Sequence, residues 1–315
     1  MKIILLSLLF FSATLFSAEA EESERVRLAI SPLLTRINVA PGESWSGEVE
    51  IFNSNNRDLN FVVFVRDFRG GDEGRVKLIE REEIEKSVDE GKEFLLSQWI
   101  DITRDIITIP ANESKILPVI IDIPENAGPG GRYATIMAAI KSPEDLFSGT
   151  SLIVSPSVGS LILLNVRGDV VEEAFLREFS TRRTLYNDSE VGFSVRLQNT
   201  GNTHIQPRGD IRIYNQWNRV VGSMLINHNT EFGNVLPQSE RGWNFEWDGR
   251  DSFLEMGRYK ATLTLVYGEE ASHLISKDIY FWIIPLNIVV GLLGFVLLLL
   301  LAITLVERFG YRNID

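Results

Sequence analysis

Two segments with one shared pattern decide the fold: Val49-Glu-Ile-Phe-Asn53-Ser-Asn-Asn56 and Val195-Arg-Leu-Gln-Asn199-Thr-Gly-Asn202. Each alternates apolar and polar residues, then reaches an asparagine followed by small polar residues. Alternation with a period of two is typical of a strand with one buried face, and Asn, Ser and Gly favour turns. Because the same strand-and-turn unit occurs twice, the sequence predicts an internal duplication.

Matching signals extend the duplication on both sides of these segments and keep one order along the chain. The matched pairs are Pro41-Gly42-Glu43-Ser44 with Asn187-Asp188-Ser189-Glu190, Pro110-Ala-Asn-Glu-Ser114 with Pro237-Gln-Ser239-Glu240, and Gly131-Arg132-Tyr133 with Gly257-Arg258-Tyr259. Further β-rich runs lie between them at regular spacing, as in antiparallel β-sandwiches. We therefore predict a mainly β chain with two tandem Ig-like antiparallel β-sandwiches, residues 21–168 and 169–279, meeting near Gly168-Asp169.

The first unit contains an insertion. Its asparagine and the downstream proline are 57 residues apart, against 38 in the second unit. The extra residues fall in the charged segment Arg69–Leu96, where Ile84 and Val88 have the spacing of a short amphipathic helix. Inserted surface segments often carry specific contacts, which makes Glu82 and Glu83 candidate partner-contact residues. A decorative, solvated loop is the alternative interpretation.

Both ends of the chain carry membrane signals. Residues 1–20 have the features of a secretory signal peptide, with an apolar run before the small-x-small site Ala18-Glu19-Ala20. Residues 283–306, uncharged from Ile288 to Val306, predict a C-terminal transmembrane helix, followed by a cytoplasmic tail at 307–315. Together they predict a single-pass plasma-membrane protein with its N-terminus outside and its C-terminus cytoplasmic.

Aromatic and basic residues flank the apolar run. Tyr280, Phe281 and Trp282 precede it, and aromatic rings of this kind are favoured at membrane–water interfaces. Arg308 and Arg312 follow it, in agreement with the excess of positive charge on the cytoplasmic side. We therefore expect these five residues to lie at the membrane interface.

The composition excludes several classes of partner and site. The formal net charge of −12 falls on the exported part, which argues against nucleic acid and anionic lipid headgroups as partners. The chain has no cysteine, so no disulfide and no thiol nucleophile are expected. His204, His228 and His273 lack metal-ligand spacing. No catalytic motif occurs, and we expect no cofactor, no metal site and no enzyme activity.

Aromatic residues give a further, mild binding signal. Trp243, Phe245 and Trp247 alternate with polar residues and so share one sheet face, either as core or as a platform for stacking on sugars, with core favoured. Trp217 lies between two predicted strands, where it either folds over the end of the sandwich or contacts a partner. If Trp217 and the Arg69–Leu96 insertion occupied the same end of the molecule, they would form a composite binding surface.

The first unit resembles the peptidoglycan-binding domain of WxL-interacting proteins over roughly residues 25–166. The residues that carry the resemblance are Ser31-Pro32, Val39-Ala40-Pro41-Gly42, Val49-Glu-Ile-Phe-Asn53, Trp99-Ile100, Ile109-Pro110-Ala111-Asn112-Glu113-Ser114 and Val119–Pro124 with Gly130-Gly131. The order of signal, two Ig-like domains and one membrane span is also similar to that family. The tail is shorter and less basic than is usual there, and from Val170 onward the resemblance is one of architecture only.

These observations predict a bacterial membrane-anchored cell-surface protein. Its tandem Ig-like domains would recognise a cell-envelope polymer such as peptidoglycan, as the resemblance implies, or another surface protein. A chaperone-like assembly factor for exported proteins is the alternative, and it requires an open edge strand with apolar residues. An enzyme acting on envelope glycans is a second alternative, and it requires two convergent carboxylates.

Overall fold

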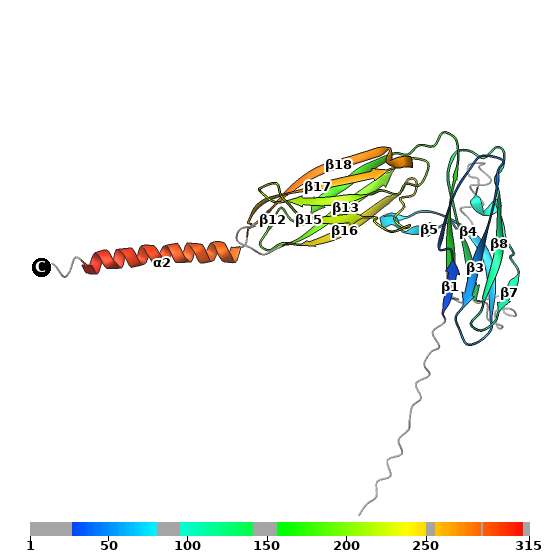
Figure 1. Ribbon diagram of the computed structural model, residues 1–315, viewed down its shortest axis with the longest axis horizontal. Coiled ribbons are helices and arrows are strands. Elements are labelled where there is room, and N and C mark those ends of the chain that lie inside the picture. Colours follow the sequence, from blue (N-terminus) through cyan, green and yellow to red (C-terminus); the bar gives the residue numbers. More distant parts are fainter. Residues whose placement is uncertain (1–26, 81–94, 141–155, 250–255, 285, 311–315) are drawn as a thin grey trace, which may run out of the picture.

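The computed structural model describes residues 27–80, 95–140, 156–249, 256–284 and 286–310. It contains two β-sandwiches that meet at an angle, and a C-terminal helix that extends away from the second sandwich (Figure 1). The predicted signal peptide at residues 1–20 lies outside the described residues. The prediction of a mainly β chain with Ig-like sandwiches is confirmed.

The first sandwich has one sheet in the order β1-β3-β8-β6 and a second in the order β2-β10-β9-β4-β5, with β7 also pairing with β4. Its strands are β1 (Leu28–Ser31), β2 (Leu34–Val39), β3 (Ser44–Asn53), β4 (Leu59–Gly70), β5 (Val76–Leu78), β6 (Ile100–Asp101), β7 (Ile106–Ile109), β8 (Ser114–Asp122), β9 (Gly130–Ile140) and β10 (Ser157–Val166). Two 3₁₀ turns, η1 (Asp72–Gly74) and η2 (Leu96–Gln98), complete it.

The second sandwich repeats this arrangement with sheets β11-β13-β16 and β12-β18-β17-β14-β15. Its strands are β11 (Ala174–Thr181), β12 (Leu185–Tyr186), β13 (Glu190–Asn199), β14 (Arg208–Tyr214), β15 (Val220–Ile226), β16 (Glu240–Asp248), β17 (Gly257–Tyr267) and β18 (His273–Ile283). The 3₁₀ turn η5 (Glu269–Ala271) joins β17 to β18. In both sandwiches the first two strands belong to opposite sheets, and the second strand runs parallel to the last one.

The two asparagines that define the repeat, Asn53 and Asn199, make equivalent hydrogen bonds in the two sandwiches. Asn53 ends β3 and is 1% exposed, and Asn199 ends β13 and is 0% exposed. The Nδ2 of Asn53 donates to the carbonyl of Arg57 at 2.8 Å, and that of Asn199 donates to the carbonyl of Thr203 at 2.7 Å. Each Oδ1 accepts the amide two residues onward. The internal duplication therefore extends to the hydrogen bonds of these two side chains.

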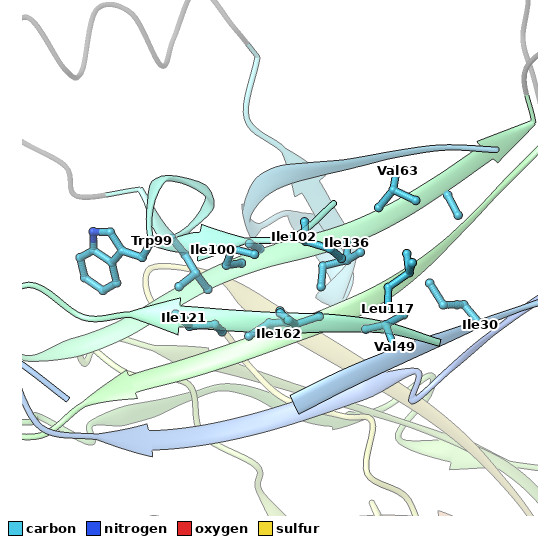
Figure 2. Packing of buried hydrophobic residues seen from close by; sticks show 14 of the residues in the cluster. Ile30, Val49, Val63, Trp99, Ile100, Ile102, Leu117, Ile121, Ile136 and Ile162 are labelled. Atoms are coloured by element: carbon cyan, nitrogen blue, oxygen red, sulfur yellow. The ribbon is translucent and has the colours of Figure 1, made fainter. Parts of the chain in front are cut away.

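Apolar side chains from both sheets of the first sandwich fill its interior (Figure 2). Ile51, Phe61 and Ile121 are fully buried there, at alternate positions of their strands. The second sandwich has its own core, in which Tyr259 and Phe281 stack with ring centroids 5.4 Å apart. Each sandwich is held by core packing, in a chain without cysteine.

Helix α2 (Leu286–Gly310) follows β18 almost directly. Its described side chains, residues 289–305, are mostly exposed apolar groups, including Leu297 and Leu298, each 66% exposed. Within the described part of the chain, no helix is both long enough and apolar enough to cross a membrane. Ile283, which the sequence placed in the helix, is instead the buried last residue of β18, because inward-facing positions continue the strand alternation to that point.

The insertion lies where the two sandwiches meet. Its described part forms η1 and β5, and η1 packs against β16 of the second sandwich. The predicted helix around Ile84 and Val88 and the candidate residues Glu82 and Glu83 lie outside the described residues.

Candidate binding surfaces

A small apolar cluster fixes the junction between the sandwiches. Leu236 of the second sandwich is 7% exposed and packs into a cluster with Phe68, Tyr133 and Leu163 of the first. The main chain adds a direct bond, because the Gly131 amide donates to a carbonyl of the second sandwich, that of Asn202, at 2.8 Å. The junction is thus built from buried side chains and paired backbone, which favours one fixed orientation.

Two glycines in the first sandwich permit this close contact. A Cβ placed on Gly70 would lie 2.3 Å from the Cβ of Ser239. Gly74 has φ +74°, a conformation that favours glycine, and a Cβ there would lie 2.7 Å from the Cγ of Arg241. Both contacts are made by the insertion end of the first sandwich, so the insertion serves as part of the junction.

On its polar side, the junction has a cavity of about 540 Å³ that is open to solvent. Arg36, Arg208 and Glu172 line it, together with the turn at Glu269 and Glu270. Basic and acidic groups are mixed here, so the cavity offers no strong field of one sign. The guanidinium of Arg36 is already occupied by carbonyl and amide oxygens of the second sandwich. We interpret the cavity as the polar margin of the junction.

His204 sits at the centre of that margin. Its Nδ1 lies 3.5 Å from the hydroxyl of Tyr133, and the two rings meet edge to face. Burial, together with the smaller effect of the nearby Arg36 guanidinium, lowers the pKa of His204 to about 4. The imidazole is therefore neutral at physiological pH, and it acts here as a packing group at the junction.

Asp67 is the most unusual carboxyl in the first sandwich. It is 2% exposed, its Oδ1 accepts the Ser97 amide at 3.0 Å, and its Oδ2 has no partner among the described residues. Burial raises the pKa of this carboxyl. Because Ser97 lies in η2, Asp67 anchors that turn to β4. Among the described residues, no group of three or more His, Asp or Glu side chains could hold a metal ion.

One edge of the second sandwich, that of β18, is accessible over most of its length. On one side β18 pairs with β17 along its whole length, and on the other side it pairs with β12 only at Trp282 and Ile283. The Trp282 amide donates to the Thr184 carbonyl at 2.8 Å, so even-numbered amides point toward this edge. The N–H and C=O groups of Leu274, Ser276, Asp278 and Tyr280 consequently face an edge that no described strand covers.

Apolar side chains accompany this open edge. Leu274 is 66% exposed and Tyr280 is 49% exposed. The opposite edge of the same sheet is β15, where Val220 and Leu225 are exposed. An open strand edge with exposed apolar side chains is the geometry that strand addition requires.

The residues predicted to contact a partner or the membrane do not lie together in the structure. Trp217 is 56% exposed in the turn between β14 and β15, near the α2 end of the second sandwich. The described part of the insertion lies at the opposite end, against β16, so that part forms no composite surface with Trp217. Tyr280 and Trp282 are exposed beside α2, whereas Phe281 is fully buried. Phe281 was therefore wrongly assigned to the membrane interface, because alternate strand residues face opposite sides.

The structure also places the aromatic residues of β16 and locates one of the two arginines near the C-terminus. Trp247 is 7% exposed, and Trp243 and Phe245 pack partly buried against the same core. The core interpretation of this aromatic trio is confirmed. Arg308 lies within α2, in a part whose side chains the structure does not describe, and Arg312 lies outside the described residues. The sequence did not reveal the open edge of β18, because only the two-residue length of β12 creates it.

No protein-family model and no curated protein matches the sequence. Among solved structures, the class 5 fimbriae chaperone CfaA aligns at 14% identity, over 80% of this chain and 98% of that chain, with a TM-score of 0.39. The E. coli chaperone DraB aligns at 13% identity over 82% and 97%, with a TM-score of 0.34. The Pseudomonas aeruginosa chaperone CupB2 aligns at 11% identity over 78% and 96%, with a TM-score of 0.32. These values carry no inference about partners or activity.

Proposed function

We propose that this protein is a membrane-tethered, non-catalytic binding protein of the bacterial cell envelope whose partner is another exported polypeptide. The partner would be held as an added strand along the open edge of β18, in the manner of an assembly or chaperone-like factor. The observation that carries this proposal is the edge itself, where Leu274, Ser276, Asp278 and Tyr280 present backbone donors and acceptors without a described neighbour strand.

The physical reason is the cost of leaving such an edge open. Unpaired N–H and C=O groups in a row form a template for another strand, and proteins normally cover or disrupt such an edge. In the first sandwich β2 covers the equivalent strand β10 from Leu161 to Val166. An extended partner at β18 would form main-chain bonds independent of its sequence, while exposed Leu274 and Tyr280 would select apolar residues at alternate positions.

Two sequence segments, one near each end, support the membrane tether. The uncharged run Ile288–Val306 has the length of a bilayer core at helical rise, and residues 1–20 have the form of a cleaved export signal. In this arrangement the two sandwiches stand outside the cytoplasm, close to the membrane at which exported chains emerge. The fixed junction would hold the first sandwich at a set distance and direction from that point.

Site-specific photocrosslinking tests the proposal, and the cysteine-free chain makes labelling clean. The full-length protein carrying Ser276→Cys, labelled with a thiol-reactive benzophenone in native membranes, should crosslink to exported polypeptides. The matched control is Ile120→Cys, an exposed residue on β8 that pairs with Ser46 on one side and with Asp101 on the other. Adding Leu274→Pro to Ser276→Cys removes an edge-facing donor and should abolish the adducts.

Equal adducts from the Ser276→Cys and Ile120→Cys proteins, or adducts that persist with Leu274→Pro, would contradict strand addition at β18.

We propose cell-wall polymer as a second candidate ligand, for the first sandwich. Its support is the resemblance of residues 25–166 to the peptidoglycan-binding domain of WxL-interacting proteins. A pull-down with purified cell wall tests it, using the full chain in detergent. Retention that is unchanged by Leu274→Pro would support a polymer site separate from β18, and no retention would rule the polymer out.

A further inference from the structure

Aromatic and basic side chains alternate on one sheet face next to α2. On the outer face of the sheet, Tyr214, Lys260 and Tyr280 lie opposite one another on β14, β17 and β18. One step closer to α2, Arg258 lies opposite Trp282. Strand register thus places two rows of rings and cations side by side.

Contacts order these rows without burying them. The guanidinium of Arg258 lies 4.0 Å from the ring centroid of Tyr280, and the ammonium of Lys260 lies 4.7 Å from that of Tyr214. Yet Tyr280 is 49% exposed and Trp282 is 46% exposed. Exposed rings held in place by cations form a preorganised surface rather than a core.

Three further exposed apolar residues extend the face at the same end. Leu185, 53% exposed, pairs with Trp282 across the β12–β18 ladder. Val220 is 57% exposed and lies opposite Tyr214 at the start of β15. Trp217 is 56% exposed in the adjoining turn.

That turn is fixed at the α2 end of the sandwich. Its Gln216 packs so closely on Gly257 that a Cβ there would lie 2.4 Å from the Gln216 Oε1, and Gly257 pairs with Ile283, the last residue of β18.

The chain path places this face next to α2. Trp282 precedes Leu286, the first residue of α2, by four positions, and an extended chain advances about 3.4 Å per residue. The Ile284 amide also donates to the Tyr186 carbonyl at 2.8 Å, which ties the connection to the sandwich. The face therefore cannot move far from wherever α2 is anchored.

We propose that these residues form a headgroup face, defined as Leu185, Trp217, Val220, Arg258, Lys260, Tyr280 and Trp282, which lies in the phospholipid headgroup layer of the membrane that α2 enters. This proposal rests on the membrane tether proposed above. Tryptophan and tyrosine prefer that layer because one part of each ring is apolar and another can hydrogen-bond. Arg258 and Lys260 would meet lipid phosphates, so the net charge of −12 does not describe this local surface.

Fluorescence quenching by lipids brominated near the top of the acyl chain tests the headgroup face. The full chain would be placed in phosphatidylcholine–phosphatidylglycerol nanodiscs with or without the brominated lipid. Of the six tryptophans, only Trp217 and Trp282 should be quenched. Trp217→Phe and Trp282→Phe should each remove about half of the quenching, and the double variant nearly all of it.

The matched control is Trp45→Phe on β3 of the first sandwich, which should leave the quenching unchanged. Co-elution of the protein with the nanodiscs reports the tether separately. A chain that does not co-elute would refute the tether of the proposed function. A chain that co-elutes but shows no quenching, or keeps its quenching in the Trp217→Phe, Trp282→Phe double variant, would overturn the headgroup face while leaving the tether in place.

Discussion

The two sandwiches share a topology and differ at the edges of their larger sheets. In the first, β2 runs beside β10 over six residue pairs, whereas in the second, β12 runs beside β18 over two. The opposite edges differ as well, since β5 lies at the junction while β15 is uncovered. The larger sheet of the first sandwich thus uses its edges for its own structure and for the junction. The second leaves both edges of its larger sheet available.

This difference matches the division of structural and binding roles that we propose for the two sandwiches. The buried asparagines are kept in both units, because the turns that they satisfy belong to the fold. The edge strands β2 and β12 differ in length, and each core is filled by side chains from the longer strands. Each prediction below either tests what the two sandwiches share or sharpens what separates them.

The largest effect is expected for the shared asparagines. Asn53→Ala and Asn199→Ala each leave at least two turn carbonyls without their buried donor, which should cost about 3–5 kcal/mol of unfolding free energy. Denaturant unfolding of the two variants measures it. Exposed Asn126→Ala is the control and should change little. If one of the two substitutions left the unfolding free energy unchanged, the two sandwiches would not share this stabilising asparagine.

The second-largest loss of stability is expected for a substitution at the junction. Leu236→Ala removes a buried side chain shared by both sandwiches and should cost about 2–4 kcal/mol. Because the cluster lies between the sandwiches, we expect a single unfolding transition to separate into two, as followed by calorimetry. Val171→Ala, at an exposed position, serves as the control. A single transition with unchanged midpoint would mean that the junction contributes no coupling.

Acid should weaken the junction through His204. The folded pKa of about 4 lies below the ordinary value of 6.5, so the unfolded chain binds the proton more readily. The stability that His204 contributes is complete above pH 6.5 and decreases as the pH falls toward 4, by up to about 3 kcal/mol. The comparison is the pH dependence of unfolding in His204→Gln and in His228→Gln. Only His204→Gln should flatten the slope between those values, and an unchanged slope would refute this assignment.

Sequence alone predicted the fold well, because alternation, turn residues and the repeated asparagines are local signals. The glycines of the two matched Gly-Arg-Tyr segments, Gly131 and Gly257, lie within one residue of the starts of β9 and β17. It could not predict the edges, since strand exposure depends on how far β2 and β12 run beside their partners. Phe281 was misassigned for a similar reason, because composition marks an aromatic cluster but only register decides which ring faces the core.

Amide hydrogen exchange tests the central claim, the open edge of β18, most directly. In the full-length protein, the edge-facing amides Ser276, Asp278 and Tyr280 should exchange rapidly, while Leu163 and Asn165 of β10, which face β2, should be protected. A bound exported polypeptide should then protect the three β18 amides and leave those of β10 unchanged. Slow exchange at Ser276, Asp278 and Tyr280 in the free protein, or no added protection with the partner bound, would contradict the account.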